Sequence, residues 1–262
     1  MSWLKLFTSL TVLQTSRNVT SPLGDNFADI MSSSAEVNQQ YFNKIAADYD
    51  KRFAPFLNEI NDELQSQADF IGIKKGARLL DYACGTGFVS SCFSDVIGQA
   101  VGVDITENMI GAYNVKAANA NVPEDQRKAY LGNLLSTPPS PSLDGSLFRD
   151  FDVAGVGMGF HHFEDTTLAA TRLAERLVPG GSLFVLDFLP HGADTHSGHD
   201  AVRGVHHMGF DEDKTRSMFE AAGAGRDFAY KELSSVIVME NTPEQGQTLR
   251  RRLFLARGTK TA

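Results

Sequence analysis

Two runs of apolar residues at helical spacing come first in the periodic part of the chain. Between residues 35 and 50, apolar side chains recur at three- and four-residue steps, as Tyr41, Phe42 and Ile45 illustrate. A second run with the same spacing extends from Phe56 to Ile71. This period gathers apolar side chains on one face of a helix. The sequence therefore predicts two amphipathic helices here.

From residue 78 onward, short apolar runs alternate with helical segments. The first run, Arg78–Ala83, is closed by Gly85 and Gly87, which is typical of a buried strand entering a tight turn. The same reasoning predicts further strands at 100–104, 129–132, 151–158 and 182–188, and helices at 88–97, 107–120 and 166–177. Pro179-Gly180-Gly181 is predicted as the turn between the last of these helices and the last of these strands. Alternation of this kind predicts a parallel sheet with helices on both faces.

The last part of the chain changes pattern again. A helix is predicted at 211–222, followed by two apolar strands at 228–239 and 249–256. The polar connection between these strands indicates an antiparallel pair. No repeat or composition shift marks a second domain. We therefore expect one α/β domain over residues 35–262, with a seven-stranded, mostly parallel sheet and an N-terminal helical cap.

Residues 1–34 are expected to form a leader ahead of this domain. Before Asp25 the chain carries Lys5 and Arg17, no acidic residue and many Ser and Thr, which is the composition of a mitochondrial transit peptide. The alternative is a leader without structure, with Ser32–Ser34 as a helix entry. Leu6–Ser16 is too short and too polar to cross a membrane. We expect a cytoplasmic protein, with a mitochondrial location as the alternative.

Composition narrows the function classes. The formal charge of −8 argues against a broad electropositive surface for nucleic acid and favours a small-molecule partner. The chain has 42% hydrophobic residues, which is ordinary for a globular protein. Its two cysteines, Cys84 and Cys92, do not make a disulfide framework and indicate reduced thiols.

Candidate chemistry lies in the turn after the first predicted strand, Asp81–Gly87. In open α/β sheets this turn meets the charged end of a nucleotide-like cofactor. Gly85 and Gly87 permit close backbone approach, and the next helix offers N–H groups to an anion. The turn lacks the third glycine of the dinucleotide fingerprint, and Asp81 would repel a pyrophosphate. A zwitterion with an ammonium and a carboxylate fits better.

The second predicted strand ends in Asp104, whose carboxylate can accept hydrogen bonds from both hydroxyls of a ribose. An amino-acid head and a nucleoside tail together describe S-adenosylmethionine. The combination of the turn, Asp81 and Asp104 therefore predicts this cofactor, although many α/β proteins need glycines in such a turn simply to reverse direction.

At this point the sequence resembles a known family. Its motifs are similar to those of class I, Rossmann-like, S-adenosylmethionine-dependent methyltransferases, and they lie at Leu79–Gly87, Gly102–Met109, Phe151–Val153 and Leu177–Gly181. The similarity runs from about Tyr41 to Ala256. Residues 41–50 resemble the opening helix of small-molecule methyltransferases that include ubiquinone and menaquinone biosynthesis enzymes.

The resemblance implies roles for the residues of the turn. Asp81, Ala83, Gly85 and Gly87 would line the methionine moiety, and Asp104 would hold the ribose. Ala83 stands where the usual pattern has its first glycine. A side chain of this size is tolerated there if φ is negative.

The resemblance also implies an adenine pocket. Ile105 and Met109 would pack on the base, and Asn133 stands where the family often has Asp facing the adenine amino group. The amide oxygen of Asn133 can accept the same bond. Tyr41 and Tyr49 would close over the cofactor, although their spacing fits plain core packing equally well.

Histidines supply the candidate catalytic groups. His162 follows the fourth predicted strand, where it could deprotonate a hydroxyl or an enol, or only hydrogen-bond the loop. His207 belongs by resemblance to a lid over the acceptor. The His- and Asp-rich stretch 190–209 matches no common zinc spacing, so no metal is predicted.

The preferred function is methyl transfer to a small, partly apolar acceptor by in-line displacement, with positioning as the main source of catalysis. One alternative is a protein that binds S-adenosylmethionine without turnover and serves assembly or regulation. A nicotinamide-dependent oxidoreductase is less favoured because of Asp81 and the missing glycine.

Overall fold

The computed structural model describes residues 33–192, 204–240 and 248–261. Residues 33–262 group into one compact unit. Nearly all of the predicted leader, residues 1–34, lies outside the described residues, as does most of the His-rich stretch.

The helices and strands alternate along the chain in the predicted order. The α-helices are α2 (Ser34–Ile45), α3 (Tyr49–Gln65), α4 (Ala68–Ile71), α5 (Phe88–Cys92), α6 (Glu107–Asn119), α7 (Thr166–Ala174) and α9 (Glu212–Ala221). Single 3₁₀ turns are η1 (Ala46–Asp48), η2 (Pro141–Leu143), η3 (Ser146–Phe148) and η4 (Phe160–His162). The strands are β1 (Arg78–Tyr82), β2 (Gln99–Asp104), β3 (Arg127–Leu131), β4 (Phe151–Gly157), β5 (Leu177–Phe188), β6 (Arg226–Glu240) and β7 (Thr248–Thr259).

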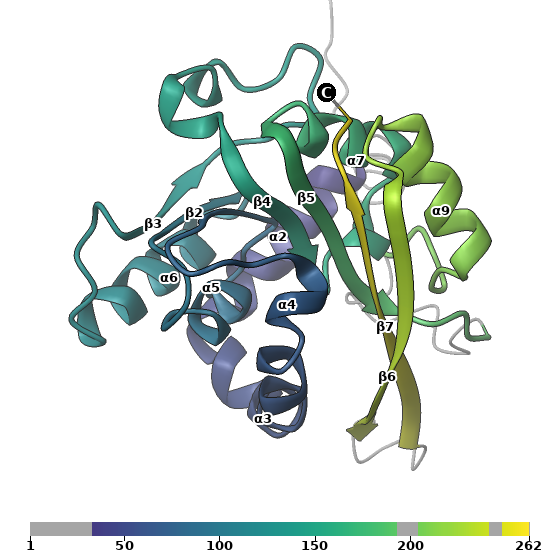
Figure 1. The fold of residues 1–262 in the computed structure, drawn as a ribbon. Helices are drawn as coiled ribbons and strands as arrows, with labels where there is room; N and C mark the ends of the chain where they lie inside the picture. The colour runs from purple at the N-terminus through teal and green to yellow at the C-terminus, as the bar shows by residue number, and fades with distance from the viewer. Residues whose placement is uncertain (1–32, 193–203, 241–247, 262) are drawn as a thin grey trace, which may run out of the picture. The chain divides into compact units, whose positions relative to one another are not determined.

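The strands form one seven-stranded sheet in the order β3-β2-β1-β4-β5-β7-β6 (Figure 1). The first five strands are parallel to one another, with β1 between β2 and β4. β7 pairs antiparallel with both β5 and β6. The predicted Rossmann-like sheet with a C-terminal antiparallel pair is therefore confirmed. The order in which successive strands join the sheet reverses between β1 and β4, so the carboxyl ends of β1, β2 and β4 open toward a common crevice.

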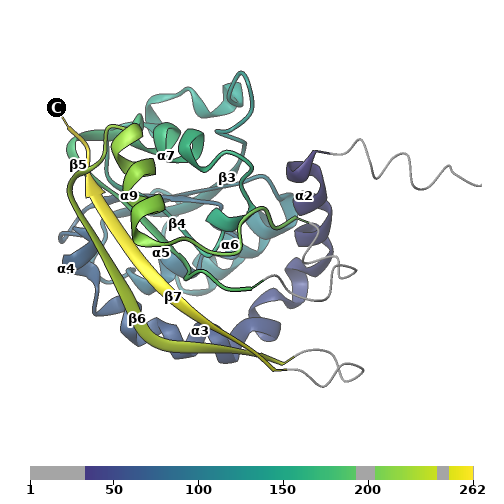
Figure 2. The ribbon, with the colours of Figure 1, turned by 90° about the vertical axis from the view of Figure 1, so that its right-hand side faces the viewer.

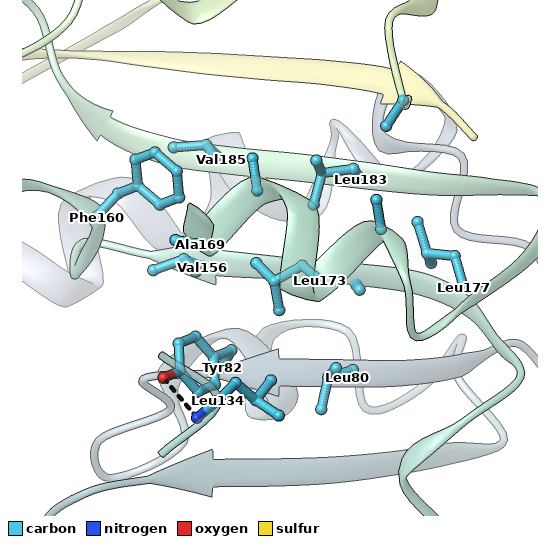
Figure 3. Close-up of a cluster of buried hydrophobic side chains, with 14 of the residues drawn as sticks. Leu80, Tyr82, Leu134, Val156, Phe160, Ala169, Leu173, Leu177, Leu183 and Val185 are labelled. Atoms are coloured by element: carbon cyan, nitrogen blue, oxygen red, sulfur yellow. Dashed lines mark hydrogen bonds between the residues drawn. The ribbon is translucent and has the colours of Figure 1, made fainter. Parts of the chain in front are cut away.

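Helices cover both faces of the sheet (Figures 1 and 2). On one face, α3, α4 and α5 pack around Leu79. On the other face, α7 and α9 pack around the neighbouring Leu80. Because successive strand residues point to opposite faces, strands buried on both sides are apolar at nearly every position. Figure 3 shows the second cluster, in which Leu173 of α7 lies over β4 and β5.

The N-terminal cap consists of α2, η1 and α3. Ser33 begins α2 with a capping box, in which its Oγ accepts the Glu36 N–H and Glu36 Oε2 accepts the Ser33 N–H. This confirms the predicted helix entry. At its far end the cap is fastened to the sheet, because the Glu63 carboxylate accepts hydrogen bonds from the backbone N–H and hydroxyl groups of Ser234 and Ser235.

Several boundaries differ from the predictions. The first predicted helix breaks at η1, so that α3 begins at Tyr49. α5 ends at Cys92 instead of residue 97. The Pro179-Gly180-Gly181 segment, predicted as a turn, lies within β5, where the pairing with β4 jumps from Phe151↔Leu177 to Val153↔Ser182. Proline and glycine mark a strand irregularity there instead of its boundary.

Two smaller expectations concern the chain's environment. Cys84 and Cys92 are both free and buried. Among the described residues, no helix is both long and apolar enough to cross a membrane.

Candidate active site

A cavity of about 310 Å³ opens at the carboxyl ends of β1, β2 and β4 and is bordered by the cap. Most of the predicted site residues line it, from several elements and turns: Tyr49, Ala83, Gly85, Asp104, Ile105, Met109, Asn133 and His162. The remaining predicted residues, Tyr41, Asp81, Gly87 and His207, do not line it. The cavity lies at the lower end of the size range typical of small-molecule sites.

The turn after β1 has a left-handed backbone at three positions. φ is +52° at Ala83, +51° at Gly85 and +84° at Gly87. The condition under which an alanine is well tolerated at position 83, a negative φ, is therefore not met. A residue with a Cβ pays about 1–2 kcal/mol for this conformation. Ala83 stores strain in a turn that borders the cavity.

Gly87 and Asp81 are packed beneath the turn, against Tyr113 and Ser90. A Cβ on Gly87 would lie 2.6 Å from the Tyr113 ring, so only glycine fits. Asp81 is 1% exposed, and its Oδ2 accepts hydrogen bonds from the Ser90 N–H at 3.1 Å and the Ser90 hydroxyl at 2.6 Å. Burial raises the pKa of Asp81 to about 7. In this structure the carboxyl group fastens β1 to α5 and does not face the cavity.

Asp104 lies at the end of β2 with its carboxylate at the cavity wall. Oδ2 accepts the Gly85 N–H at 2.9 Å and Oδ1 accepts the Thr106 N–H at 2.8 Å. Burial raises the pKa of this carboxyl group. The Thr106 side chain and the Ile105 backbone also act on this carboxyl group as hydrogen-bond donors. At the end of β2, the Asp104 carboxylate is the acceptor that the cavity offers to hydroxyl groups of a ligand.

Asn133 follows β3, and its amide is used differently from the prediction. Oδ1 accepts hydrogen bonds from the Tyr82 hydroxyl at 3.2 Å and from the Leu135 N–H at 2.8 Å. These two bonds saturate the oxygen. Within the described residues Nδ2 makes no hydrogen bond. The group that Asn133 can offer to the cavity is therefore a donor, and the predicted acceptor role is not supported by this geometry.

The two tyrosines of the cap lie in different surroundings. Tyr49 lines the cavity, and burial, with Asp50 and Asp104 nearby, raises the pKa of its hydroxyl. Tyr41, like Tyr49, packs against the cluster of Ile45 and Met109, which joins the cap to α6, but Tyr41 does not line the cavity. Only Tyr49 has the position expected of a residue that closes over a ligand.

Polar contacts hold the cap against both walls of the cavity. On one wall, the Ser34 hydroxyl donates to Glu164 Oε1 at 2.5 Å. On the other, Gln39 Nε2 donates to the Ile105 carbonyl at 2.7 Å. Asp50 adds a third link, since it accepts the Thr86 hydroxyl at 2.5 Å. The cap is thereby tied to the glycine-rich turn itself.

His162 lies in η4, beyond the end of β4. Its Nδ1 lies 2.8 Å from the Gly204 carbonyl, which can only accept, so Nδ1 carries the proton and Nε2 the lone pair. Asn38 Nδ2 donates to the same carbonyl at 3.2 Å. Burial, followed by the neighbouring His161, lowers the pKa of His162 to about 3. The ring is therefore neutral at physiological pH and packs edge-on against Phe42, with ring centroids 5.3 Å apart.

His207 lies apart from this group. Its Nδ1 is 3.2 Å from Lys214 Nζ, and its ring packs against Phe210. Burial and the Lys214 charge lower the pKa of His207. His207 does not line the cavity, and its Nδ1 accepts a hydrogen bond from Lys214. In this arrangement it is not placed to act as a base on a substrate in the cavity.

Several residues of the site carried no signal in the sequence. Asn38, Phe42 and Thr86 line the cavity, but in the sequence they look like ordinary helix or turn residues. Asp187 and His161 form a buried pair with Oδ1 and Nδ1 2.8 Å apart. A polar residue that ends an apolar strand, as Asp187 nearly does, is the one clue that could have singled it out.

Comparison with known proteins identifies the family. A sequence family described as a methyltransferase domain matches residues 45–224. The chain belongs to this methyltransferase family. The prediction of a methyltransferase that uses S-adenosylmethionine is thereby confirmed at the level of the family.

Curated relatives match a part of the chain. An uncharacterised methyltransferase of Schizosaccharomyces pombe is 33% identical over 57% of this chain and 54% of its own length. A ubiquinone/menaquinone biosynthesis C-methyltransferase of Saccharophagus degradans is 27% identical over 56% of this chain and 57% of its own length. The matches thus span about half the length of these relatives.

Solved structures share the fold. A phosphoethanolamine N-methyltransferase of Haemonchus contortus, in complex with S-adenosyl-L-methionine, has a TM-score of 0.63 at 15% identity, over 88% of this chain and 61% of that chain. A putative methyltransferase of Haloferax volcanii, in complex with the activator Trm112, has a TM-score of 0.60 at 17% identity, over 84% of this chain and 98% of that chain. At these identities the likeness concerns architecture alone.

Proposed function

We propose that this methyltransferase transfers a methyl group from S-adenosylmethionine to a small, partly apolar acceptor that carries no anionic group. The composition of the cavity wall carries the proposal. No residue that lines the cavity is Lys or Arg within the described chain, whereas its aromatic and aliphatic lining includes Phe42, Phe56, Leu57, Phe88 and Met158. An acceptor with a phosphate or carboxylate would lose its hydration there without gaining a cationic partner.

The residues present fit the cofactor. Asp104 offers two carboxylate oxygens to the ribose hydroxyls, and Ile105 and Met109 offer apolar surface to the adenine. Asn133 would donate its Nδ2 proton to an acceptor nitrogen of the base. Ala83 and Gly85 border the position left for the methionine moiety. When bound, the cofactor supplies an activated methyl group on a positively charged sulfur.

His162 would orient the acceptor. The Gly204 carbonyl fixes its tautomer, so Nε2 can accept a hydrogen bond from an O–H or N–H group. A group whose pKa lies near 3 holds a proton too weakly to serve as the final base at neutral pH. We therefore assign His162 the task of aligning the nucleophile, and the released proton passes to water. Alignment of this kind is a large part of catalysis in a displacement reaction.

The curated relatives agree with a small-molecule acceptor. The names of the Saccharophagus degradans and Staphylococcus aureus relatives refer to quinone biosynthesis and to demethylmenaquinone. Both describe acceptors with a large apolar part, which matches the aromatic lining seen here.

Two experiments test the proposal, first calorimetry for cofactor binding and then an assay for methylated product. S-adenosylhomocysteine should bind and NAD should not. Labelled S-adenosylmethionine with a metabolite extract should then yield a product that reversed-phase resin retains and anion-exchange resin does not. Binding without any labelled product would instead favour a cofactor-binding protein without turnover, and failure to bind S-adenosylhomocysteine would remove the proposal.

A pair of variants isolates His162. His162→Gln retains an acceptor atom near the position of Nε2, whereas His162→Phe keeps only the ring shape. We expect His162→Phe to lower turnover by a factor on the order of 10 to 100. His162→Gln should retain much of the activity, and neither change should alter the affinity for S-adenosylhomocysteine. Equal activity of the two variants would contradict the orienting role.

A further inference from the structure

A buried pair of polar residues, Asp187 and His161, lies next to His162 and has no part in the mechanism described above. Asp187, near the end of β5, is fully buried. Its Oδ1 lies 2.8 Å from His161 Nδ1 and accepts the Phe188 N–H at 2.7 Å. Its Oδ2 accepts the His161 N–H at 3.1 Å. Neither Asp187 nor His161 lines the cavity, so neither touches a bound substrate.

His161 connects three parts of the site. Its ring lies 4.2 Å from the His162 ring, measured between centroids. Its carbonyl oxygen accepts the N–H groups of His206 and His207, at 2.9 and 3.2 Å. These bonds hold the same segment that contains Gly204, whose carbonyl fixes the tautomer of His162. His162 is thus linked to His161 both directly, through ring contact, and indirectly, through this segment.

Asp187 in turn holds His161 by both its backbone and its ring. Burial alone would raise the pKa of the Asp187 carboxyl, but His161 and the hydrogen bonds together lower it, so the carboxylate is charged. Phe160, the residue before His161, is anchored in the apolar cluster of Figure 3. η4 therefore has an apolar anchor at Phe160 and a hydrogen-bonded anchor at His161, and the second holds the histidine itself.

We propose that Asp187 is a positioning residue, which clamps His161 to the end of β5 and thereby holds His162 and the Gly204 carbonyl in register at the cavity. This inference rests on the proposed function, because it gives His162 its orienting role. It predicts that loss of the clamp disturbs the tautomer and orientation of His162 without disturbing the cofactor end of the cavity.

The first test compares two substitutions of the same chemical kind. Asp187→Asn keeps the size of the side chain but replaces an acceptor oxygen with a donor nitrogen. Glu63→Gln is the matched control, since Glu63 also accepts several hydrogen bonds, between α3 and β6, but does not line the cavity or contact η4. Side-chain ¹⁵N and ¹³C signals of His162 report its tautomer, and titration with S-adenosylhomocysteine reports the cofactor end.

We expect the wild-type protein and Glu63→Gln to show His162 as the single Nδ1–H tautomer. Asp187→Asn should show mixed tautomers, unchanged affinity for S-adenosylhomocysteine, and turnover lower by a factor on the order of 10 to 100 with the extract fraction that gives labelled product. Unaltered His162 signals in Asp187→Asn, or the same alteration in Glu63→Gln, would overturn the proposal.

A second pair covers the case in which Asp187→Asn does not fold. His161→Asn keeps an N–H donor near the position of Nδ1, and His161→Phe removes it. The clamp predicts a wild-type His162 spectrum for His161→Asn and a disturbed one for His161→Phe, and matching spectra would refute it. Failure of the wild-type protein to bind S-adenosylhomocysteine would count against the proposed function, while the His162 spectra would still decide on the clamp.

Discussion

Replacing Ala83 with glycine tests the strained turn beside the cavity. Ala83 has a φ of +52°, which costs a residue with a Cβ about 1–2 kcal/mol and costs glycine nothing comparable. Glycine also gives the unfolded chain more freedom, which lowers stability by about 0.4–1 kcal/mol. At the midpoints of these ranges, Ala83→Gly should raise the free energy of unfolding by about 0.8 kcal/mol. For a chain of this size, the melting temperature should rise by about 2–3 °C.

The assay is urea unfolding of the cofactor-free protein, with the slope against urea expected to stay constant. Ala120→Gly is the matched control, because Ala120 is an exposed helix-end residue with a φ of −82°. The same chemical change should there lower the free energy of unfolding by about 0.5–1 kcal/mol. The two variants should therefore shift stability in opposite directions. A loss of stability in Ala83→Gly as large as that in Ala120→Gly would refute the strain argument.

Three further predictions follow from the same region. Gly87→Ala should cost at least about 2 kcal/mol of stability by urea unfolding, because a Cβ at a φ of +84° would also meet the Tyr113 ring. Asp104→Asn should weaken S-adenosylhomocysteine binding by about 10- to 100-fold in calorimetry, since hydrogen bonds to a charged group contribute about 1.5–3 kcal/mol. Because burial raises the pKa of Asp81 to about 7, the folded cofactor-free protein holds a proton that the unfolded chain has lost. Its stability should fall as pH rises from about 4 to about 7, and Asp81→Asn should flatten this dependence in unfolding curves.

The fold could be predicted from local sequence patterns because strands and helices space their apolar residues differently. Strands buried on both faces, such as β1 and β4, stand out as short apolar runs between glycines. Amphipathic helices such as α3 stand out by their three- and four-residue spacing. The Pro179-Gly180-Gly181 segment was mistaken for a turn, since the same residues also accommodate a shift in strand pairing. Only the neighbouring strand β4 distinguishes these two uses.

The cofactor end of the site could be predicted further than the acceptor end. Asp104 and Gly85 lie at fixed distances from strand ends, so the topology of the sheet brings them together. The surroundings of His162 come instead from the cap and from the segment that contains Gly204. Asn38 and Gly204 are 166 residues apart in sequence, yet they are hydrogen-bonded. No local spacing encodes such a contact, and the buried pair of Asp187 and His161 escaped prediction for the same reason.

Part of the chain's excess of acidic residues lies at the cavity, where it affects which ligands can bind. Asp104, Glu164 and Asp165 line the cavity, and no described cationic side chain does. A sulfonium and an ammonium gain from such surroundings. A protonated His162 would add a positive charge to a cavity that would hold a cationic cofactor, whereas burial lowers the pKa of His162 and keeps the ring neutral. The same field disfavours an anionic acceptor. The electrostatics that suit the cofactor are thus consistent with the proposed acceptor, which carries no anionic group.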